Sequence, residues 1–172
     1  MAKMTESDIE VMAIEYLQGL GYEYVYGPDI EPCGINPLRS YQQVILEEKV
    51  RTALQRLNPH LSEQKCEETL KQVMQISTPD LMANNLAFHR VLTVSKDGNT
   101  QGELASLMDF KDPTNNEFLV INQLTIKEGN YSRRPDLILF INGLPLVVIE
   151  LKNAADENAT VSGAYNQIKT YQ

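Results

Sequence analysis

The sequence predicts an α/β (α+β) fold, in which a mixed, mostly antiparallel central sheet is flanked by helices. Apolar residues recur at helical spacing through much of the first 90 residues, as expected for amphipathic helices. Short runs rich in Val, Ile, Leu and Phe then follow between residues 92 and 152, and these are typical of strands. A final segment, from about residue 159 to residue 172, returns to a helical pattern. Helices, then a sheet, then a helix indicate a layered α/β or α+β domain.

The first predicted helix has clear signals at both ends. Thr5 is a suitable N-cap, and Asp8 lies three residues later, close to the spacing of a capping box. Gly21 is a typical C-terminal stop. A loop rich in Gly and Pro is predicted from residue 27 to about residue 37. The apolar positions with helical spacing are Ile9, Met12, Ala13, Tyr16, Leu17 and Leu20.

Three further helices are predicted in a helical region at about 40–90. The first is amphipathic and covers residues 44–57, and Ser62 caps the second. The tripeptide Thr78-Pro79-Asp80 supplies a cap and a proline suited to the first turn of the third. Because no Gly/Ser-rich linker separates this region, we expect a single domain over residues 1–172, with 40–90 as an insertion within it.

Five strands are predicted after this region. They are separated by Asp-Gly, Asp-Pro and Asn-Asn turns, and the last two are joined at Asn142-Gly143, a strong hairpin signal. The predicted strands cover residues 92–95, 103–110, 117–126, 136–141 and 146–152.

Composition limits the class of protein. A chain of 172 residues is long enough for one domain with a real core, and its formal net charge of −8 argues against a protein that coats DNA with a basic face. A nuclease remains possible, because a divalent cation reverses the local charge of a carboxylate site. Two cysteines, Cys33 and Cys66, lack a CxxC spacing and indicate free thiols. Without an apolar signal segment or a membrane-spanning run, we expect a cytoplasmic protein.

The last hairpin brings charged residues together. If Ile141 pairs with Pro145 across a three-residue loop, Asp136 falls opposite Glu150, with their Cβ atoms roughly 5 Å apart. A two-residue loop shifts the register by one position, and both alternatives stay open. Lys152 shares a face with Glu150, because side chains alternate along a strand.

Two carboxylates and an amine at the ends of apolar strands are sufficient for phosphodiester hydrolysis. Oxygen ligands of this kind suit Mg²⁺, which polarises a phosphate and acidifies an attacking water. Lys152 would position that water or stabilise charge on the phosphate in the transition state. The alternative is structural: Asp136 begins a strand, and Glu150 and Lys152 form an exposed edge pair.

The pattern Pro135-Asp136 with Glu150-Leu151-Lys152 resembles the PD-(D/E)xK nuclease superfamily. The wider sequence resembles the N-terminal nuclease domain of the restriction (R) subunit of type I restriction enzymes. The resembling stretches run through nearly the whole chain and are TESDIEVMAIEYLQGLGYEYVYGPDI, ALQRLNPHL, LMDFKDPTNNEFLVINQLTI, RRPDLILFINGLPLVVIELKN and QIKTY.

This resemblance implies a restriction-endonuclease-like core and a type I site-specific deoxyribonuclease that cleaves double-stranded DNA in an ATP-dependent complex. The implied partners are motor domains of the same subunit and methylase and specificity subunits, the last of which would recognise the DNA sequence. The chain contains no GxxxxGK[ST] motif, so we expect a fragment of a larger motor-containing subunit, with ATP used only by domains outside it.

The resemblance also implies further site residues. Gln167 and Tyr171 match the QxxxY motif of the family, and their spacing puts them on one face of the terminal helix. The Leu151 carbonyl would join Asp136 and Glu150 at the metal, and an acidic residue of the first helix would assist, for which Glu10 is our choice over Glu6 and Glu15.

Two alternative functions remain open. The chain is alternatively a junction-resolvase-like nuclease, or a non-catalytic docking or coupling module for a DNA motor or methylase partner. Arg133 and Arg134 would touch phosphate or form salt bridges, whereas His60 and His89 lack a metal-ligand spacing and are expected to be structural.

Overall fold

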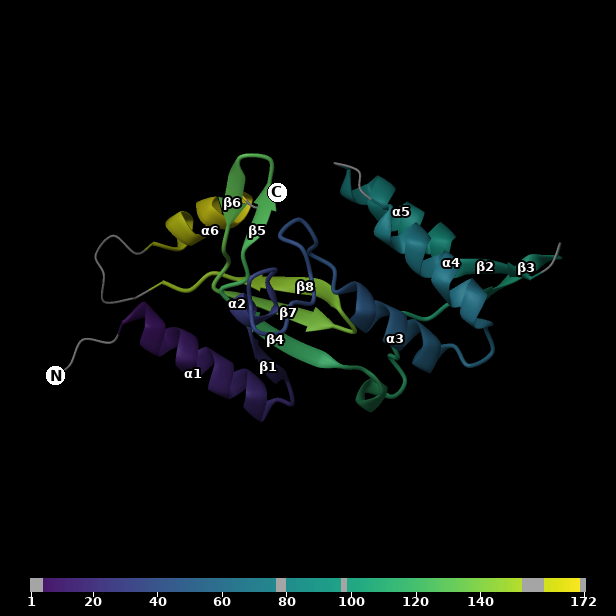
Figure 1. Cartoon of the computed structure of the whole chain (residues 1–172), viewed down its shortest axis with the longest axis horizontal. Coiled ribbons are helices and arrows are strands. Elements are labelled where there is room, and N and C mark those ends of the chain that lie inside the picture. The colour runs from purple at the N-terminus through teal and green to yellow at the C-terminus, as the bar shows by residue number, and fades with distance from the viewer. Residues whose placement is uncertain (1–4, 77–79, 97–98, 153–159, 171–172) are drawn as a thin grey trace. The chain divides into compact units, whose positions relative to one another are not determined.

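The computed structural model describes residues 5–76, 80–96, 99–152 and 160–170 (Figure 1). The chain divides into two compact units. The first consists of Met1–Val44 with Phe118–Gln172, and the second of Ile45–Glu117. The second unit corresponds to the helical region expected at about 40–90 but extends further along the chain.

A four-stranded mixed sheet forms the centre of the first unit. Its strands lie in the order β1-β4-β7-β8. β1 and β4 are parallel, whereas β4 with β7 and β7 with β8 are antiparallel. The predicted α/β class with a mixed, mostly antiparallel sheet is therefore confirmed. The strand bounds are β1 (Glu23–Tyr26), β4 (Phe118–Asn122), β7 (Leu137–Ile141) and β8 (Leu144–Ile149).

The first helix, α1 (Glu6–Gly19), covers one face of this sheet, as Figure 1 shows. Both bonds of the predicted capping box are present: the Thr5 N–H donates to Asp8 Oδ2 at 2.8 Å, and the Asp8 N–H donates to Thr5 Oγ1 at 3.2 Å. Ile14 packs against apolar side chains of β4 and β7. The core on this face contains Ile14, Val120, Leu137 and Leu139, with Ala13, Leu17, Tyr22, Tyr24, Ile149 and Leu151 at its margin.

Smaller elements accompany the other face of the sheet. A hairpin of β5 (Ile126–Glu128) and β6 (Tyr131–Arg133) lies near the terminal helix α6 (Val161–Lys169) in Figure 1. A four-residue helix, α2 (Gly27–Ile30), follows β1. The predicted strand over residues 117–126 is wrong in extent, because Gln123 adopts a φ of +53° and ends β4. β1, β6 and all of β5 beyond Ile126 were not predicted.

The β7–β8 hairpin combines the two registers that the sequence left open. Ile141 pairs with Leu144, so the loop is the two-residue Asn142-Gly143, with φ values of +51° and +83° that suit a type I′ turn. A bulge then leaves Leu146 without a pairing partner, and Leu139 pairs with Val147. From there to the end of the ladder the register is the one predicted for the three-residue loop.

The second unit contains three helices followed by a hairpin. The helices are α3 (Glu47–Leu57), α4 (Glu63–Met74) and α5 (Leu81–Leu92), and the hairpin consists of β2 (Thr93–Lys96) and β3 (Asn99–Leu104). The predicted cap is present at Ser62, whose Oγ accepts the Lys65 N–H at 3.3 Å. Thr78 and Pro79 lie outside the described residues, and the Asp80 carboxylate accepts the first N–H groups of α5 instead.

The strand predicted over residues 103–110 is wrong for most of its length. β3 ends at Leu104, and the Asp109 carboxylate accepts the main-chain N–H groups of Lys111 and Asp112, which forms a turn. A short 3₁₀ helix, η1 (Pro113–Asn115), follows this turn. Within the unit, Asn58 connects α3 to the segment after β3, because its amide donates to the Leu54 and Ser106 carbonyls and its Oδ1 accepts the Ser106 N–H.

Both predicted free thiols are free, with Cys33 exposed and Cys66 buried. None of the helices in the described part of the chain combines the length and hydrophobicity needed to cross a bilayer.

Candidate active site at the ends of the central strands

Asp136 stands immediately before β7 and is held on two sides. Its Oδ2 accepts the main-chain N–H of Leu151 at 2.7 Å, and its own carbonyl accepts the N–H of Gln123 at 3.1 Å. Pro135, just before it, is buried and has no N–H that would need a partner. These contacts fix Asp136 between the end of β4 and the end of β8.

Glu150 and Lys152 follow β8 directly. The last pair of the ladder is Leu137 with Ile149, so Asp136 and Glu150 are the next residues on neighbouring strands. Ile149 and Leu151 both pack on the α1 side of the sheet. By alternation, Glu150 and Lys152 belong to the opposite face, and both are half-buried.

The terminal helix contacts Glu150 through Gln167. The Gln167 side-chain amide donates to Glu150 Oε2 at 2.6 Å, so one member of the predicted QxxxY motif touches the predicted metal ligand. Thr160 caps this helix, since its Oγ1 accepts the Gly163 N–H at 3.0 Å. Tyr171, the second member of the motif, lies outside the described residues.

Glu10 lies on the α1 side of the sheet. Its Oε1 accepts the side-chain amide of Asn122 at 2.6 Å, and its Oε2 accepts that of Gln123 at 2.7 Å. Asn122 Oδ1 in turn accepts the Tyr24 hydroxyl at 3.1 Å. Burial, and then the nearby Glu10 charge, raise the pKa of Tyr24 above its ordinary value, which favours the protonated hydroxyl that donates this bond.

The structure thus brings some predicted residues together and leaves others apart. Gln167 bonds to Glu150, Asp136 accepts the N–H of Leu151 next to Glu150, and Gln123 links Glu10 to the Asp136 carbonyl. Glu6 and Glu15 are exposed on α1.

The two residues that bind Glu10, Asn122 and Gln123, were missed by the sequence reasoning. The signal was present: a polar Asn-Gln pair interrupts the apolar stretch LVINQL, as polar residues do at functional strand ends. The sequence reasoning treated this pair as part of a continuous strand, and so its side chains received no role.

Arg133, for which phosphate contact and salt bridges were both considered, binds main-chain oxygens. Its Nε donates to the Thr170 carbonyl at 3.0 Å, and its Nη1 to the Ser132 carbonyl at 3.1 Å. This ties β6 to the C-terminal end of α6, where carbonyls are otherwise unsatisfied and a cation is favourable. Arg134 and His60 are exposed, and the side chain of His89 is not among those described.

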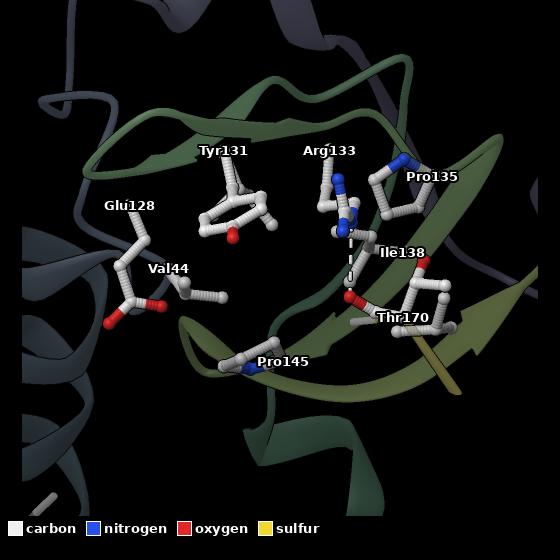
Figure 2. A pocket seen from close by; sticks show the side chains of 10 residues that line it. Val44, Glu128, Tyr131, Arg133, Pro135, Ile138, Pro145 and Thr170 are labelled. Carbon is white, nitrogen blue, oxygen red and sulfur yellow. Dashed lines mark hydrogen bonds between the residues drawn. The ribbon is translucent and has the colours of Figure 1, made fainter. Parts of the chain in front are cut away.

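A cavity of about 490 Å³ lies between the β5–β6 hairpin and the face of the sheet that carries Glu150. Figure 2 shows Tyr131 and Arg133 along one side of it, with Pro145 and Ile138 from the two sheet strands on the other. Its lining is mainly apolar, with Arg133 and Glu128 as the charged side chains.

The donor set is compatible with a hard divalent cation. Asp136 and Glu150 supply carboxylates, and a main-chain carbonyl lies between Glu150 and Lys152. Within the described ranges, no three His, Cys, Asp or Glu side chains are grouped closely enough to hold a metal by themselves. Mg²⁺ does not require such a group, because it is usually bound by one or two carboxylates, waters and substrate phosphate oxygens.

Comparison with known proteins identifies relatives that match nearly the full length of this chain. The family described as the type I restriction enzyme R protein N terminus matches residues 3–172. The endonuclease subunit of the type I restriction enzyme HindI of Haemophilus influenzae is 36% identical over 177 residues, which cover 98% of this chain and 17% of that subunit. A putative type I restriction enzyme MjaIXP endonuclease subunit of Methanocaldococcus jannaschii is 34% identical over 179 residues, again 98% of this chain and 17% of the relative. The chain therefore spans about a sixth of the length of these relatives.

Proposed function

Because the chain belongs to the family of N-terminal domains of type I restriction enzyme R proteins, we propose that it is a Mg²⁺-dependent endonuclease domain that hydrolyses phosphodiester bonds of double-stranded DNA. In this proposal it is the cleavage module of an ATP-dependent cytoplasmic restriction complex. Motor domains of the same subunit, together with methylase and specificity subunits, are the proposed partners.

The register between β7 and β8 carries the proposal. Since Leu137 pairs with Ile149, the carboxylates of Asp136 and Glu150 emerge at adjacent positions where two apolar strands end. Like charges at adjacent positions of neighbouring strands repel each other, and a bound cation offsets that repulsion. A divalent metal is therefore the simplest partner for the pair.

The proposed roles follow from the chemistry of each group. Asp136 and Glu150, with the Leu151 carbonyl, would hold Mg²⁺, and Glu10 would assist at the metal site. The cation would supply charge neutralisation at the scissile phosphate and a more acidic water. Lys152, on the same face as Glu150, would orient the attacking water and stabilise negative charge that builds up on the phosphate oxygens.

The terminal helix would support these groups. Gln167 donates to Glu150 Oε2 and so fixes the rotation of that carboxylate. Tyr171, the second member of the motif, would orient either the catalytic groups or the DNA backbone.

Nicking of supercoiled plasmid by the purified chain tests the proposal directly, with Mg²⁺ or Mn²⁺ present. Glu150→Ala and Lys152→Ala should each abolish metal-dependent nicking. Glu15→Ala and Lys71→Ala, which remove exposed charges elsewhere on helices, serve as matched controls and should cleave as the parent chain does. The same four variants are then placed in the full restriction complex with ATP.

Cleavage by the complex that survives Glu150→Ala or Lys152→Ala would overturn the proposal. Loss of partner binding in the Lys152→Ala complex, measured by size-exclusion chromatography, would instead favour the docking module considered as an alternative.

A further inference from the structure

A second polar group lies on the α1 side of the sheet, on the far side from Lys152. It consists of Glu10, Asn122, Gln123 and Tyr24, which are joined by three side-chain hydrogen bonds of 2.6, 2.7 and 3.1 Å. Asn122 is only 5% exposed. A carboxylate in such surroundings needs donors on both oxygens, and the two amides supply them.

The bend that carries Gln123 is held from several directions. The Thr125 N–H donates to Glu31 Oε1 at 2.6 Å, and the Thr125 carbonyl accepts Arg39 Nη1 at 2.9 Å. Gly27 lies so close that a Cβ atom there would be 2.3 Å from the Asn122 carbonyl oxygen. Gln123 itself has a φ of +53°, a left-handed conformation that costs a residue with a side chain about 1 kcal/mol or more. Such a conformation persists only where the surroundings enforce it.

Gln123 is hydrogen-bonded to both Glu10 and Asp136. Its side-chain amide donates to Glu10 Oε2 at 2.7 Å, and its main-chain N–H donates to the Asp136 carbonyl at 3.1 Å. A glutamine in the left-handed conformation can direct its N–H toward β7 while its side chain reaches α1.

We infer that Gln123 is a positioning residue of the catalytic site, through which Glu10 on α1 fixes the strand end that carries Asp136. This inference rests on the proposed function, since it concerns the position of Asp136, one of the proposed metal ligands. Glu10 acts through hydrogen bonds, and its negative charge serves to hold the two amides. The groups that orient metal ligands affect metal affinity about 10–100-fold, so the contribution is measurable.

Mn²⁺ binding by the intact chain, measured from the electron paramagnetic resonance signal of the free ion, tests this inference. Gln123→Asn is the first variant. Asparagine adopts the left-handed conformation readily but is too short to reach Glu10, so it removes the side-chain bond and spares the backbone. We expect Mn²⁺ affinity to fall about 10-fold while the thermal unfolding midpoint stays close to that of the parent chain.

An exchange of the two side chains provides the rescue. Gln123→Glu alone places a second carboxylate against that of Glu10. Glu10→Gln alone replaces the carboxylate that accepts both amides by a third amide. Each single variant should therefore lose Mn²⁺ affinity. The double variant restores a donor and an acceptor with their positions reversed, and the total charge is unchanged. We expect it to regain both the unfolding midpoint and most of the Mn²⁺ affinity.

Two outcomes overturn the inference while leaving the proposed function intact, provided that Asp136→Ala abolishes Mn²⁺ binding. One is unchanged Mn²⁺ affinity in Gln123→Asn. The other is a double variant that regains stability without Mn²⁺ affinity, which would make the Glu10 carboxylate a direct metal ligand. A parent chain that binds no Mn²⁺, or an Asp136→Ala variant that binds it normally, would overturn the proposed function and the inference together.

Discussion

Replacement of Gly27 by alanine gives a sharp test of how tightly the bend after β4 is packed. Gly27 is buried, and an added Cβ would meet the Asn122 carbonyl oxygen at 2.3 Å and the Cα and N atoms of Leu124 at 2.9 Å. All three are main-chain atoms, so no side-chain rotation relieves the overlap. The nearest one is about 1 Å inside the 3.4 Å at which ordinary contact begins.

The expected cost of Gly27→Ala follows from this overlap. Overpacking of a well-packed site costs about 1–3 kcal/mol. For a chain of this length 1 kcal/mol lowers the unfolding midpoint by about 2–4 °C, so a central value of about 2 kcal/mol corresponds to roughly 4–8 °C. Because the displaced bend carries Gln123, Mn²⁺ affinity should fall as well.

Thermal unfolding followed by circular dichroism measures this effect. Gly19→Ala is the matched control, since a Cβ at Gly19 would meet nothing within 4 Å and the residue is the last of α1. Its midpoint should stay level or rise slightly, because alanine favours a helix over glycine by up to about 1 kcal/mol. Equal midpoints for the two variants would refute the steric argument.

Three further predictions concern separate parts of the chain. Arg133→Ala removes the donor to the carbonyl of Thr170, the C-cap of α6, so amide hydrogen exchange in that helix should accelerate about 10-fold, whereas Arg134→Ala should leave it unchanged. Cys33 is exposed and should react rapidly with a thiol reagent at pH 8; burial raises the pKa of the Cys66 thiol above its usual 9.0, so a second equally fast thiol would contradict the structure. The backbone N–H and then the hydroxyl of the N-cap lower the pKa of Asp8 below 3.8. Its contribution to stability is therefore present above pH 3.8 and lost as the pH falls through the lower folded-state pKa, and an NMR titration giving an Asp8 pKa at or above 3.8 would exclude it.

The sequence predicted correctly the elements that are determined by residues close together in the chain. The capping box at Thr5 and Asp8, the helix capped by Ser62 and the turn at Asn142-Gly143 each depend on residues within a few positions of one another. β1 was missed because its four residues, of which only Val25 is aliphatic, give too short a pattern. Its place in the sheet comes from parallel pairing with β4, almost 100 residues later, which no local pattern can indicate.

In the candidate site, too, some residues were predictable from local patterns, whereas contacts between distant residues were not. Asp136, Glu150 and Lys152 were predicted from their spacing around a hairpin, and Gln167 from its resemblance to a family motif. Their catalytic roles remain predictions. The bonds of Glu10 to Asn122 and Gln123 cross 112 and 113 positions of sequence and depend on a left-handed glutamine, which residue propensities argue against.

The bulge in β8 determines which side chains of this strand face the candidate site. With a two-residue turn and an uninterrupted ladder, Asp136 would face Ile149, and Glu150 would point into the apolar layer beneath α1. The single additional residue, Leu146, reverses the parity of every position after it, which directs Ile149 and Leu151 inward and the charged pair outward. The face to which each later residue of this strand points thus depends on one additional, half-exposed leucine, and a one-residue deletion there would exchange the two sides of the strand.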